Sequence, residues 1–232
     1  MADPLLPAKA AAARAAVAEV EAGQRIALGT GSTAAEAIRA LGQRFPDGGR
    51  LDCVASSAAS EGLARSLGLS VRALEARDRF DLMLDGADEV SEDLDLTKGG
   101  GGALFREKLL ARRTDRLLIL VDPTKLVARL GTRVPIPLEV VPFAREAIVG
   151  RLRELGLPAE ARRAADGPEA YRTDNGLEIL DVRPPVPLEA PAAWDAEVRA
   201  IPGVVETGLF VGLAERVYVG TPDGRVTIRG RR

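Results

Sequence analysis

The sequence predicts an α/β fold, in which a mostly parallel sheet has helices on both faces and carries a small α+β domain. Three observations lead to this prediction. Strand-like and helix-like segments alternate over the first 130 residues. The run Leu117–Val121 is wholly apolar, as expected for a strand buried on both faces. From about Val134 onwards, prolines interrupt the pattern and the alternation ends.

The alternating part begins with an alanine-rich amphipathic helix. A later helix is supported by Ala37, Ile38 and Leu41, which share one face at helical spacing. Alternation of this kind favours parallel strands joined by helices. The pattern gives strands at 25–28, 51–55, 71–74, 80–84 and 117–121, and helices at 8–22, 34–45, about 58–67 and 103–113.

The later part reads as a small α+β insertion. Prolines punctuate a strand between residues 134 and 142, and an amphipathic helix follows at 143–155. Asp174-Asn175-Gly176 is typical of a hairpin turn before a strand at 177–182. A last helix is expected at 192–200, and the end of the chain, 208–229, returns to strands with a turn at 222–224.

Composition excludes several classes of protein. The 232 residues carry a formal net charge of −2, which argues against a general nucleic-acid binder. No apolar run approaches the roughly 20 residues that cross a bilayer, so no membrane association is expected. The single cysteine, Cys53, cannot form an internal disulfide, which fits a cytoplasmic location. It lies in a predicted strand and is expected to be a small core residue.

The chain contains no histidine. Histidine is the commonest general base and the commonest metal ligand, and only one cysteine is present, so a structural zinc site is excluded. Any proton transfer therefore falls to Asp, Glu, Lys or Tyr.

Small polar clusters follow four of the predicted strands. Ligands of open parallel sheets bind beyond the carboxyl ends of the strands, so these clusters are expected to converge on one edge and form a site. They are residues 29–33, Ser56-Ser57, residues 85–88 and residues 122–125.

The cluster at residues 29–33 joins a strand to a helix. Glycines allow a close approach of the backbone, hydroxyls donate hydrogen bonds and a helix N-terminus favours an anion, which together suggest phosphate binding. The segment lacks the lysine of a nucleotide P-loop. The alternative is that Ser32 or Thr33 only caps the helix.

Asp85 and Asp88 flank Gly86-Ala87 at the end of an apolar strand. They fit a turn with exposed acids, a magnesium site, or groups that bind sugar hydroxyls and handle protons, and the motif does not separate these readings. The acidic residues that follow are expected to form a solvated face: Glu89, Glu92, Asp93 and Asp95.

Lys98 precedes four glycines and the helix that carries Glu107. Four consecutive glycines imply a tight bend or close approach to a ligand. The helical neighbours of Glu107 are apolar, which places its carboxylate on a core-facing stripe where it needs a partner or a function. Those neighbours are Ala103, Leu104, Leu110 and Ala111, whereas Arg106, Lys108 and Arg112 are expected to reach outward. The alternative is a surface glutamate paired with Arg106 or Lys108.

Taken together, these segments resemble type A ribose-5-phosphate isomerase over nearly the whole chain, in order. Gly102 and Phe105 depart from the family, where many members have Ala and Thr. The matching stretches are GTGSTA (29–34), LDGADEV (84–90), KGGGGALFREKLLA (98–111), VDPTKLV (121–127), VPIPLEV (134–140), TDNGLEILDV (173–182), IPGVVETGLF (201–210) and GTPDG (220–224).

The resemblance implies roles for individual residues. Glu107 is the implied base that moves a proton between C2 and C1 of ribose 5-phosphate, and Lys98 with the glycine amides is implied to stabilise the negative oxygen. Asp85 and Asp88 are implied to bind sugar hydroxyls, with Asp85 assisting ring opening. The phosphate is implied to bind near Ser32, Thr33 and Lys125, with Lys9 as a further candidate to reach it. The implied substrate-binding set is Thr30, Gly31, Ser32, Thr33, Asp85, Gly86, Ala87, Asp88, Lys98, Gly99, Gly100, Gly101 and Lys125.

The same resemblance implies no metal, no organic cofactor and assembly as a homodimer or homotetramer. It implies a Rossmann-like catalytic domain over 1–130 and 206–232, and a ferredoxin-like lid or oligomerisation domain over 131–205. Three alternatives stay open at this point. They are a related amino-sugar-phosphate deaminase or CoA transferase, a non-catalytic sugar-phosphate sensor, and a magnesium-dependent phosphotransferase. A deaminase is expected to use a histidine, which this chain lacks.

Overall fold

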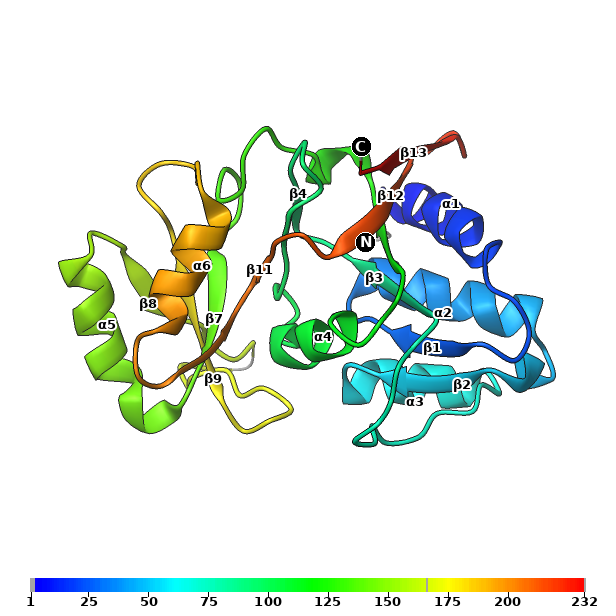
Figure 1. Cartoon of the computed structure of the whole chain (residues 1–232), viewed down its shortest axis with the longest axis horizontal. Helices are drawn as coiled ribbons and strands as arrows, with labels where there is room; N and C mark the ends of the chain where they lie inside the picture. The colour runs from blue at the N-terminus through cyan, green and yellow to red at the C-terminus, as the bar shows by residue number, and fades with distance from the viewer. Residues whose placement is uncertain (1–2, 166, 232) are drawn as a thin grey trace. The chain divides into compact units, whose positions relative to one another are not determined.

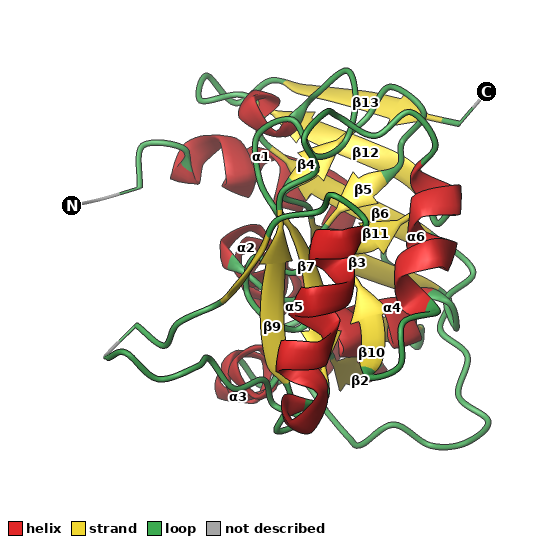
Figure 2. Ribbon diagram, turned by 90° about the vertical axis from the view of Figure 1, so that its left-hand side faces the viewer, coloured by secondary structure: helices red, strands yellow, loops and turns green. Residues whose placement is uncertain are grey.

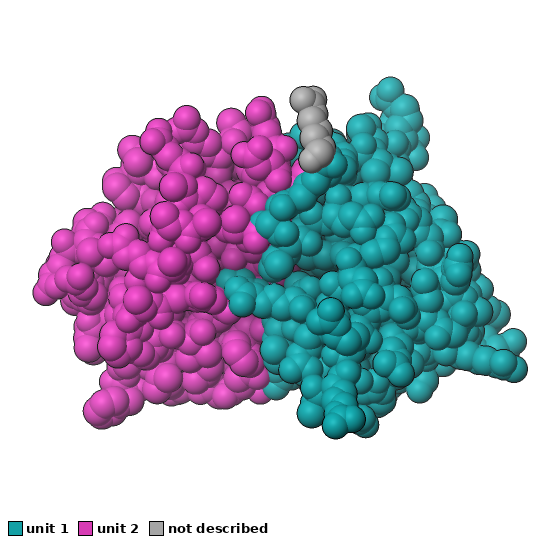
Figure 3. Space-filling view, in the orientation of Figure 1, with its two compact units in different colours: residues 1–87, 106–126, 212–232 teal, residues 88–105, 127–211 magenta. Residues whose placement is uncertain are grey.

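The computed structural model describes residues 3–165 and 167–231, which fall into two compact units (Figure 3). Unit 1 consists of Met1–Ala87, Arg106–Leu126 and Gly212–Arg232. Unit 2 consists of Asp88–Phe105 and Val127–Val211. Within residues 3–165 and 167–231, none of the helices has the length and apolar character that spanning a bilayer requires.

Unit 1 is built on a six-stranded sheet with the order β13-β12-β6-β3-β1-β2 (Figure 1). Every neighbouring pair is parallel except β12 and β13, which are antiparallel. The mostly parallel sheet is therefore confirmed. Its strands are β1 (Arg25–Leu28), β2 (Asp52–Ala55), β3 (Leu82–Gly86), β6 (Leu117–Val121), β12 (Ala214–Gly220) and β13 (Val226–Gly230).

The core of unit 1 joins this sheet to helices α1 (Leu6–Val17), α2 (Ser32–Arg44) and α3 (Ala58–Ser66). Ile26, Leu82 and Leu118 from adjacent strands pack with Ala16 and Ile38 from the helices, and all five side chains are buried. Cys53 is completely buried in the same cluster, as expected, and this burial, together with the nearby Asp52 charge, raises the pKa of its thiol to about 12. Short helical turns lie at η1 (Gly48–Arg50) and η2 (Pro123–Lys125), and α4 (Leu104–Ala111) runs from unit 2 into unit 1.

Unit 2 contains a four-stranded antiparallel sheet with the order β10-β7-β9-β8. Its chain order is strand, helix, strand, strand, helix, strand, which is the ferredoxin-like arrangement. Figure 2 shows helices α5 and α6 beside the strands of this sheet. Ile148 and Leu152 of α5 and Val198 of α6 are buried in one cluster with apolar side chains of the strands. The elements are β7 (Ile136–Val140), η3 (Pro142–Ala144), α5 (Arg145–Glu154), β8 (Ala159–Ala161), β9 (Glu178–Val182), α6 (Pro191–Arg199) and β10 (Val204–Thr207).

A second, small sheet of unit 2 has the order β11-β5-β4. Its strands are only two residues long, β4 (Glu89–Val90), β5 (Leu96–Thr97) and β11 (Leu209–Phe210). The sequence pattern missed this sheet because two residues are too few for an alternation of apolar and polar side chains to appear. It holds the two residues before Lys98, and the Lys98 amide donates to the Gly208 carbonyl at 2.8 Å just before β11.

Two predicted elements differ in the structure. The strand expected at 71–74 is wrong, because that segment makes only an isolated bridge between Val71 and Cys53. The helix expected at 8–22 ends at Val17, where the amides of Ala18 and Glu19 bond to carbonyls near the helix end. Gly23 then takes a positive φ of 86° and turns the chain into β1.

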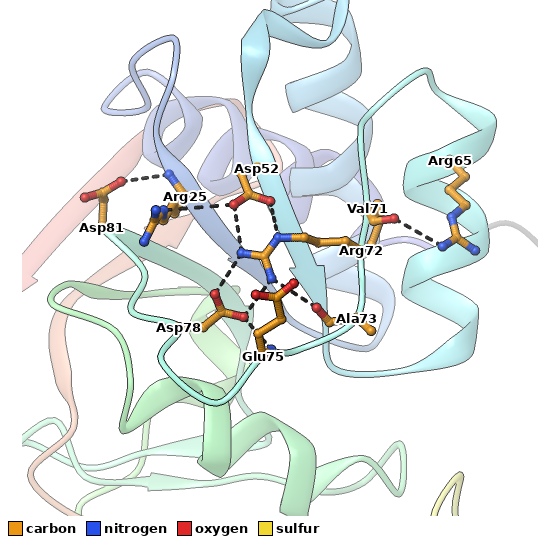
Figure 4. Close-up of polar contacts among 9 residues, drawn as sticks. All are labelled: Arg25, Asp52, Arg65, Val71, Arg72, Ala73, Glu75, Asp78 and Asp81. Carbon is orange, nitrogen blue, oxygen red and sulfur yellow. Dashed lines mark hydrogen bonds and ion pairs between the residues drawn. The ribbon is translucent and has the colours of Figure 1, made fainter.

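A cluster of charged side chains, and not strand pairing, holds the 71–81 segment (Figure 4). The guanidinium of Arg72 donates to both carboxylate oxygens of Asp52 at 2.8 Å, and to those of Asp78 at 2.7 and 2.8 Å. The Arg25 amide donates to Asp81 at 2.7 Å. Asp52 and Arg25 begin β2 and β1, so this cluster ties together the amino ends of the strands.

The Arg72 guanidinium, with the amide of Glu75, lowers the pKa of the Asp78 carboxyl to about 2. The unfolded value is about 3.9, so the folded state favours the ionised form. The stabilisation is therefore fully present above pH about 4 and is lost as the pH falls through about 2.

We expect Asp78→Asn to lower the free energy of unfolding by about 1–3 kcal/mol at pH 7, because buried Asp78 loses its charge and one of the two oxygens that accept from Arg72. The difference from the wild type should shrink between pH 4 and pH 2, as followed by thermal unfolding. Asp115→Asn is the matched control, since Asp115 is 64% exposed and lies 4.0 Å from Arg79. A difference that stays constant down to pH 2 would contradict this account.

Candidate functional site

Four polar clusters follow strands that are adjacent and parallel in the sheet of unit 1. The strands β2, β1, β3 and β6 lie in that order. Ser56-Ser57 follow β2, residues 29–33 follow β1, Asp85-Gly86 end β3, and residues 122–125 follow β6. Their carboxyl ends meet at one edge, as the sequence predicts. The chain runs from β1 to β2 on one side and continues on the other side of β1 with β3, which makes the β1–β3 crevice the topological switch point where ligands of such sheets bind.

Asp85 and Gly29 face one another at this switch point. Asp85 is fully buried, and its Oδ1 accepts hydrogen bonds from the amides of Gly86 at 2.8 Å and Thr30 at 3.2 Å. A Cβ atom on Gly29 would lie 2.1 Å from the same Oδ1. Only glycine therefore lets the β1 backbone pass beside this carboxylate.

Hydroxyl groups join the loops that follow β1 and β2. The Oγ1 of Thr30 and the Oγ of Ser56 are 2.7 Å apart, and the Oγ of Ser60 donates to the Gly29 carbonyl at 2.7 Å. Ser57 caps α3 by accepting from the Ser60 amide. Ser60 was not predicted, and its only sequence signal is its place one helical turn after a capping serine.

The N-terminus of α2 is not capped by a side chain. Gly31 occupies the cap position with a φ of 100°, a conformation that favours glycine. The alternative that Ser32 or Thr33 merely caps the helix is therefore wrong. Instead the Ser32 Oγ accepts from the Lys9 ammonium at 2.9 Å, and Lys9 also donates to Asp3 at 2.6 Å. A cation and a hydroxyl thus lie together at the positive end of a helix.

The segment after β6 contributes a second cation to unit 1. Asp122 is buried, and its carboxylate accepts from the amide of Thr124 at 2.9 Å. This bond caps the η2 turn, which ends at the half-buried Lys125. The Asp122 side chain thereby fixes the backbone that carries Lys125.

Glu107 lies on the core-facing side of α4, as predicted. Its side chain is 3% exposed, and the four apolar neighbours expected around it, residues 103, 104, 110 and 111, are buried as well. The alternative of an exposed surface glutamate is excluded. The prediction that Lys108 reaches outward is wrong, since Lys108 is 1% exposed. The helix buries two adjacent charged side chains, and its apolar periodicity revealed only the first.

In unit 2, Asp88 is joined to the glycine run. Its Oδ2 accepts from the Gly100 amide at 2.8 Å, and its own amide donates to the Thr97 carbonyl at 2.8 Å. Lys98 is 3% exposed, and its ammonium lies 5.5 Å from the centre of the Phe210 ring. Phe210 was not predicted as a site residue, because nothing in its sequence context distinguishes it from a core residue.

Glu89 is fully buried, so its assignment to a solvated acidic face is wrong. Its carboxylate accepts from the amides of Gly131 and Arg133 at 2.7 and 2.5 Å, and from the Thr97 hydroxyl at 3.1 Å. It therefore anchors the chain after Leu130 to β5. Glu92 and Asp93 are exposed and Asp95 is half-buried, as expected for that face.

The residues that the structure describes contain no group of three or more His, Cys, Asp or Glu side chains placed to hold a metal ion. The carboxylates of Asp85, Asp88, Glu89 and Asp122 each accept a backbone amide, and that of Glu89 also accepts the Thr97 hydroxyl. A carboxylate oxygen that accepts one amide keeps a further lone pair, so these carboxylates can also accept hydrogen bonds from hydroxyl groups of a ligand.

The chain matches a family model described as ribose 5-phosphate isomerase A (phosphoriboisomerase A) over residues 52–224. A protein named ribose-5-phosphate isomerase A from Deinococcus radiodurans is 45% identical over 93% of this chain and 95% of its own length. One from Thermomicrobium roseum, with the same name, is 47% identical over 94% of this chain and 91% of its own length.

Solved structures agree. Ribose 5-phosphate isomerase A from Methanocaldococcus jannaschii is similar with a TM-score of 0.89 and 37% identity, over 96% of this chain and 97% of its own. A D-ribose-5-phosphate isomerase in complex with phospho-erythronic acid has a TM-score of 0.91 and 37% identity, with the same coverage. Fold and relatives together define an aldose–ketose isomerase. The chain belongs to the ribose 5-phosphate isomerase A family.

We expect Gly29→Ala to lower the free energy of unfolding by about 1–3 kcal/mol and to reduce isomerase turnover, because the new Cβ must displace the Asp85 carboxylate. Thermal unfolding and a turnover assay measure the two effects. Gly62→Ala in α3 is the control, since a Cβ there meets nothing within 4 Å.

The clash also predicts coupling between the two positions. In an Asp85→Gly background, Gly29→Ala should cost less stability, because the three atoms nearest to the new Cβ all belong to Asp85. Equal costs in both backgrounds would show that the strain lies elsewhere.

Proposed function

We propose that this protein interconverts D-ribose 5-phosphate and D-ribulose 5-phosphate through an enediolate, with Glu107 as the base that carries the proton. The observation that carries the proposal is the burial of Glu107, at 3% exposure, on the apolar side of α4 in a member of this family. A buried carboxylate is costly to maintain, and proton transfer at carbon gives it a function.

The reaction requires a base at carbon and a donor at oxygen. The Glu107 carboxylate takes the proton from C2 of the open-chain aldose and returns it to C1, while the hydroxyl proton moves from O2 to O1. The charge that develops on oxygen needs preorganised donors, and Lys98 with amides of the glycine run that follows it has the right chemistry for this. The sequence contains no histidine that could replace them.

Asp85 and Asp88 are proposed to bind the sugar hydroxyls, and Asp85 to assist ring opening. Each carboxylate already accepts a backbone amide, at Gly86 for Asp85 and at Gly100 for Asp88, which fixes its orientation before the sugar arrives. Residues Thr30, Gly31, Gly86 and Ala87 complete the proposed sugar-binding backbone.

The phosphate is proposed to bind at the start of α2. Support comes from the side-chain-free cap at Gly31, the hydroxyls of Ser32 and Thr33, and the Lys9 ammonium on Ser32. Lys125 is proposed as the second cation. A relative binds phospho-erythronic acid, which pairs a phosphate with a carboxylate that resembles the planar enediolate.

Further proposals concern the protein as a whole. We propose that it needs no metal or organic cofactor, acts in the cytoplasm within the pentose phosphate pathway and assembles as a homodimer or homotetramer. We also propose a catalytic domain over 1–130 and 206–232, and a lid or oligomerisation domain over 131–205.

The test is conversion of ribose 5-phosphate to ribulose 5-phosphate by purified protein in EDTA. We expect activity in EDTA, and a loss in turnover of about 10²–10⁴-fold or more in Glu107→Gln, while substrate still binds. Glu61→Gln is the control, since Glu61 is 40% exposed and pairs with Arg65 across one helical turn. Near-normal turnover in Glu107→Gln would reject the base, and conversion only with added magnesium would contradict the proposal that no metal is needed.

Lys125→Ala should mainly raise KM for ribose 5-phosphate by about tenfold with a smaller change in kcat, because it removes one charge-assisted contact to the phosphate. Arg129→Ala is the control, since Arg129 is 57% exposed and pairs with Glu189. An unchanged KM in Lys125→Ala would count against the phosphate assignment.

A further inference from the structure

Two side chains from the connection between β8 and β9, Arg162 and Tyr171, hold the segment Gly99–Gly101, here called the glycine segment. Arg162 directly follows β8, and its backbone is fixed on both sides. Its amide donates to the Ile179 carbonyl at 2.9 Å, and its carbonyl accepts from the Tyr171 amide at 2.8 Å. The side chain therefore starts from a rigid position.

The Arg162 guanidinium connects Asp181 to the glycine segment. Its Nη1 donates to the carbonyls of Gly99 and Gly100 at 2.8 and 3.1 Å, while Nε and Nη2 donate to the Asp181 carboxylate at 2.9 and 2.5 Å. The side chains of Arg162 and Asp181 are 17% and 22% exposed. A planar fork held bidentately on one side fixes the direction of its remaining donors.

Tyr171 adds a second contact. Its hydroxyl donates to the Gly101 carbonyl at 3.3 Å, and its ring lies 6.0 Å from the Arg162 guanidinium carbon. A Cβ atom on Gly102 would lie 2.4 Å from the Tyr171 hydroxyl oxygen. Tyr171 therefore occupies the space that the Cβ atom of an alanine at position 102 would need. This is a physical reason why the chain has glycine there, where many family members have alanine.

These contacts decide which amide of the glycine segment is available. In a trans peptide the N–H points away from the C=O, so the Gly101 amide points away from Arg162, which holds the Gly100 carbonyl. The neighbouring amides are used, Gly100 by Asp88 and Gly102 by the Gly99 carbonyl at 2.9 Å. Gly101 is exposed, and among residues 3–165 and 167–231 none accepts a hydrogen bond from its amide.

We propose that Arg162, held by Asp181, is a positioning residue that aims the Gly101 amide at the oxygen on which negative charge develops. The inference rests on the proposed isomerase function. Arg162 does not touch the reacting atoms and acts through the carbonyls of the glycine segment.

The test compares two ligands that differ only at the reacting end. Phospho-erythronic acid carries a carboxylate there, and the corresponding polyol phosphate carries a hydroxymethyl group. In Arg162→Met we expect kcat to fall about 10- to 100-fold and the Kd of phospho-erythronic acid to rise about tenfold, because the oxyanion donor is displaced. The Kd of the polyol phosphate should stay within about twofold, because its phosphate and hydroxyl contacts are kept.

Arg163→Met is the matched control, since Arg163 is the next residue and is exposed. Arg162→Lys, which keeps the charge but loses the fork, should give an intermediate loss. If Arg162→Met does not unfold cooperatively, Arg162→Lys and Tyr171→Phe carry the same comparison.

Equal weakening of both ligands, or unchanged kcat in a folded variant, would overturn the inference. Failure of the wild-type protein to convert ribose 5-phosphate would instead reject the proposed function, so the two failures are distinguishable.

Discussion

The close approach of Gly29 to Asp85 is the constraint on which the candidate site of unit 1 depends. Parallel pairing of β1 with β3 brings a buried carboxylate beside a backbone that has no room for a Cβ atom. The same carboxylate accepts a hydrogen bond from the Thr30 amide, so Asp85 also holds the loop that leads into α2. The approach of two strands thereby fixes both a polar group and the entry to a helix N-terminus.

The two ends of the parallel sheet are used for different purposes. The amino ends carry the network of Arg72, Asp52 and Asp78, in which every charge has a partner (Figure 4). The carboxyl ends carry hydroxyls, glycines and the lysines at positions 9 and 125. Loops at the carboxyl ends can therefore vary with the ligand while the opposite edge supplies stability.

Buried carboxylates in unit 2 accept hydrogen bonds that fix nearby loops. Glu89 accepts two amides and a hydroxyl, and Glu139 accepts the Thr173 hydroxyl and the Asn175 side-chain amide at 2.8 and 2.9 Å. The Arg162–Asp181 pair extends this pattern to carbonyl groups of the glycine segment. Glycines cost much conformational entropy to order, and these polar contacts offset that cost by fixing the segment in one conformation.

The sequence by itself determined the parallel sheet, the four polar strand ends and the burial of Glu107, because periodicity reports which face of an element turns inward. It did not determine the burial of Glu89 or Lys108, the loss of the 71–74 strand, or the contacts of Arg162. Those depend on partners distant in the chain, since Glu89 bonds to residues 131 and 133 and Arg162 to Gly99. A charged residue gives the same sequence signal whether its side chain is solvated by water or hydrogen-bonded to the folded backbone. Only the tertiary structure decides between these two environments.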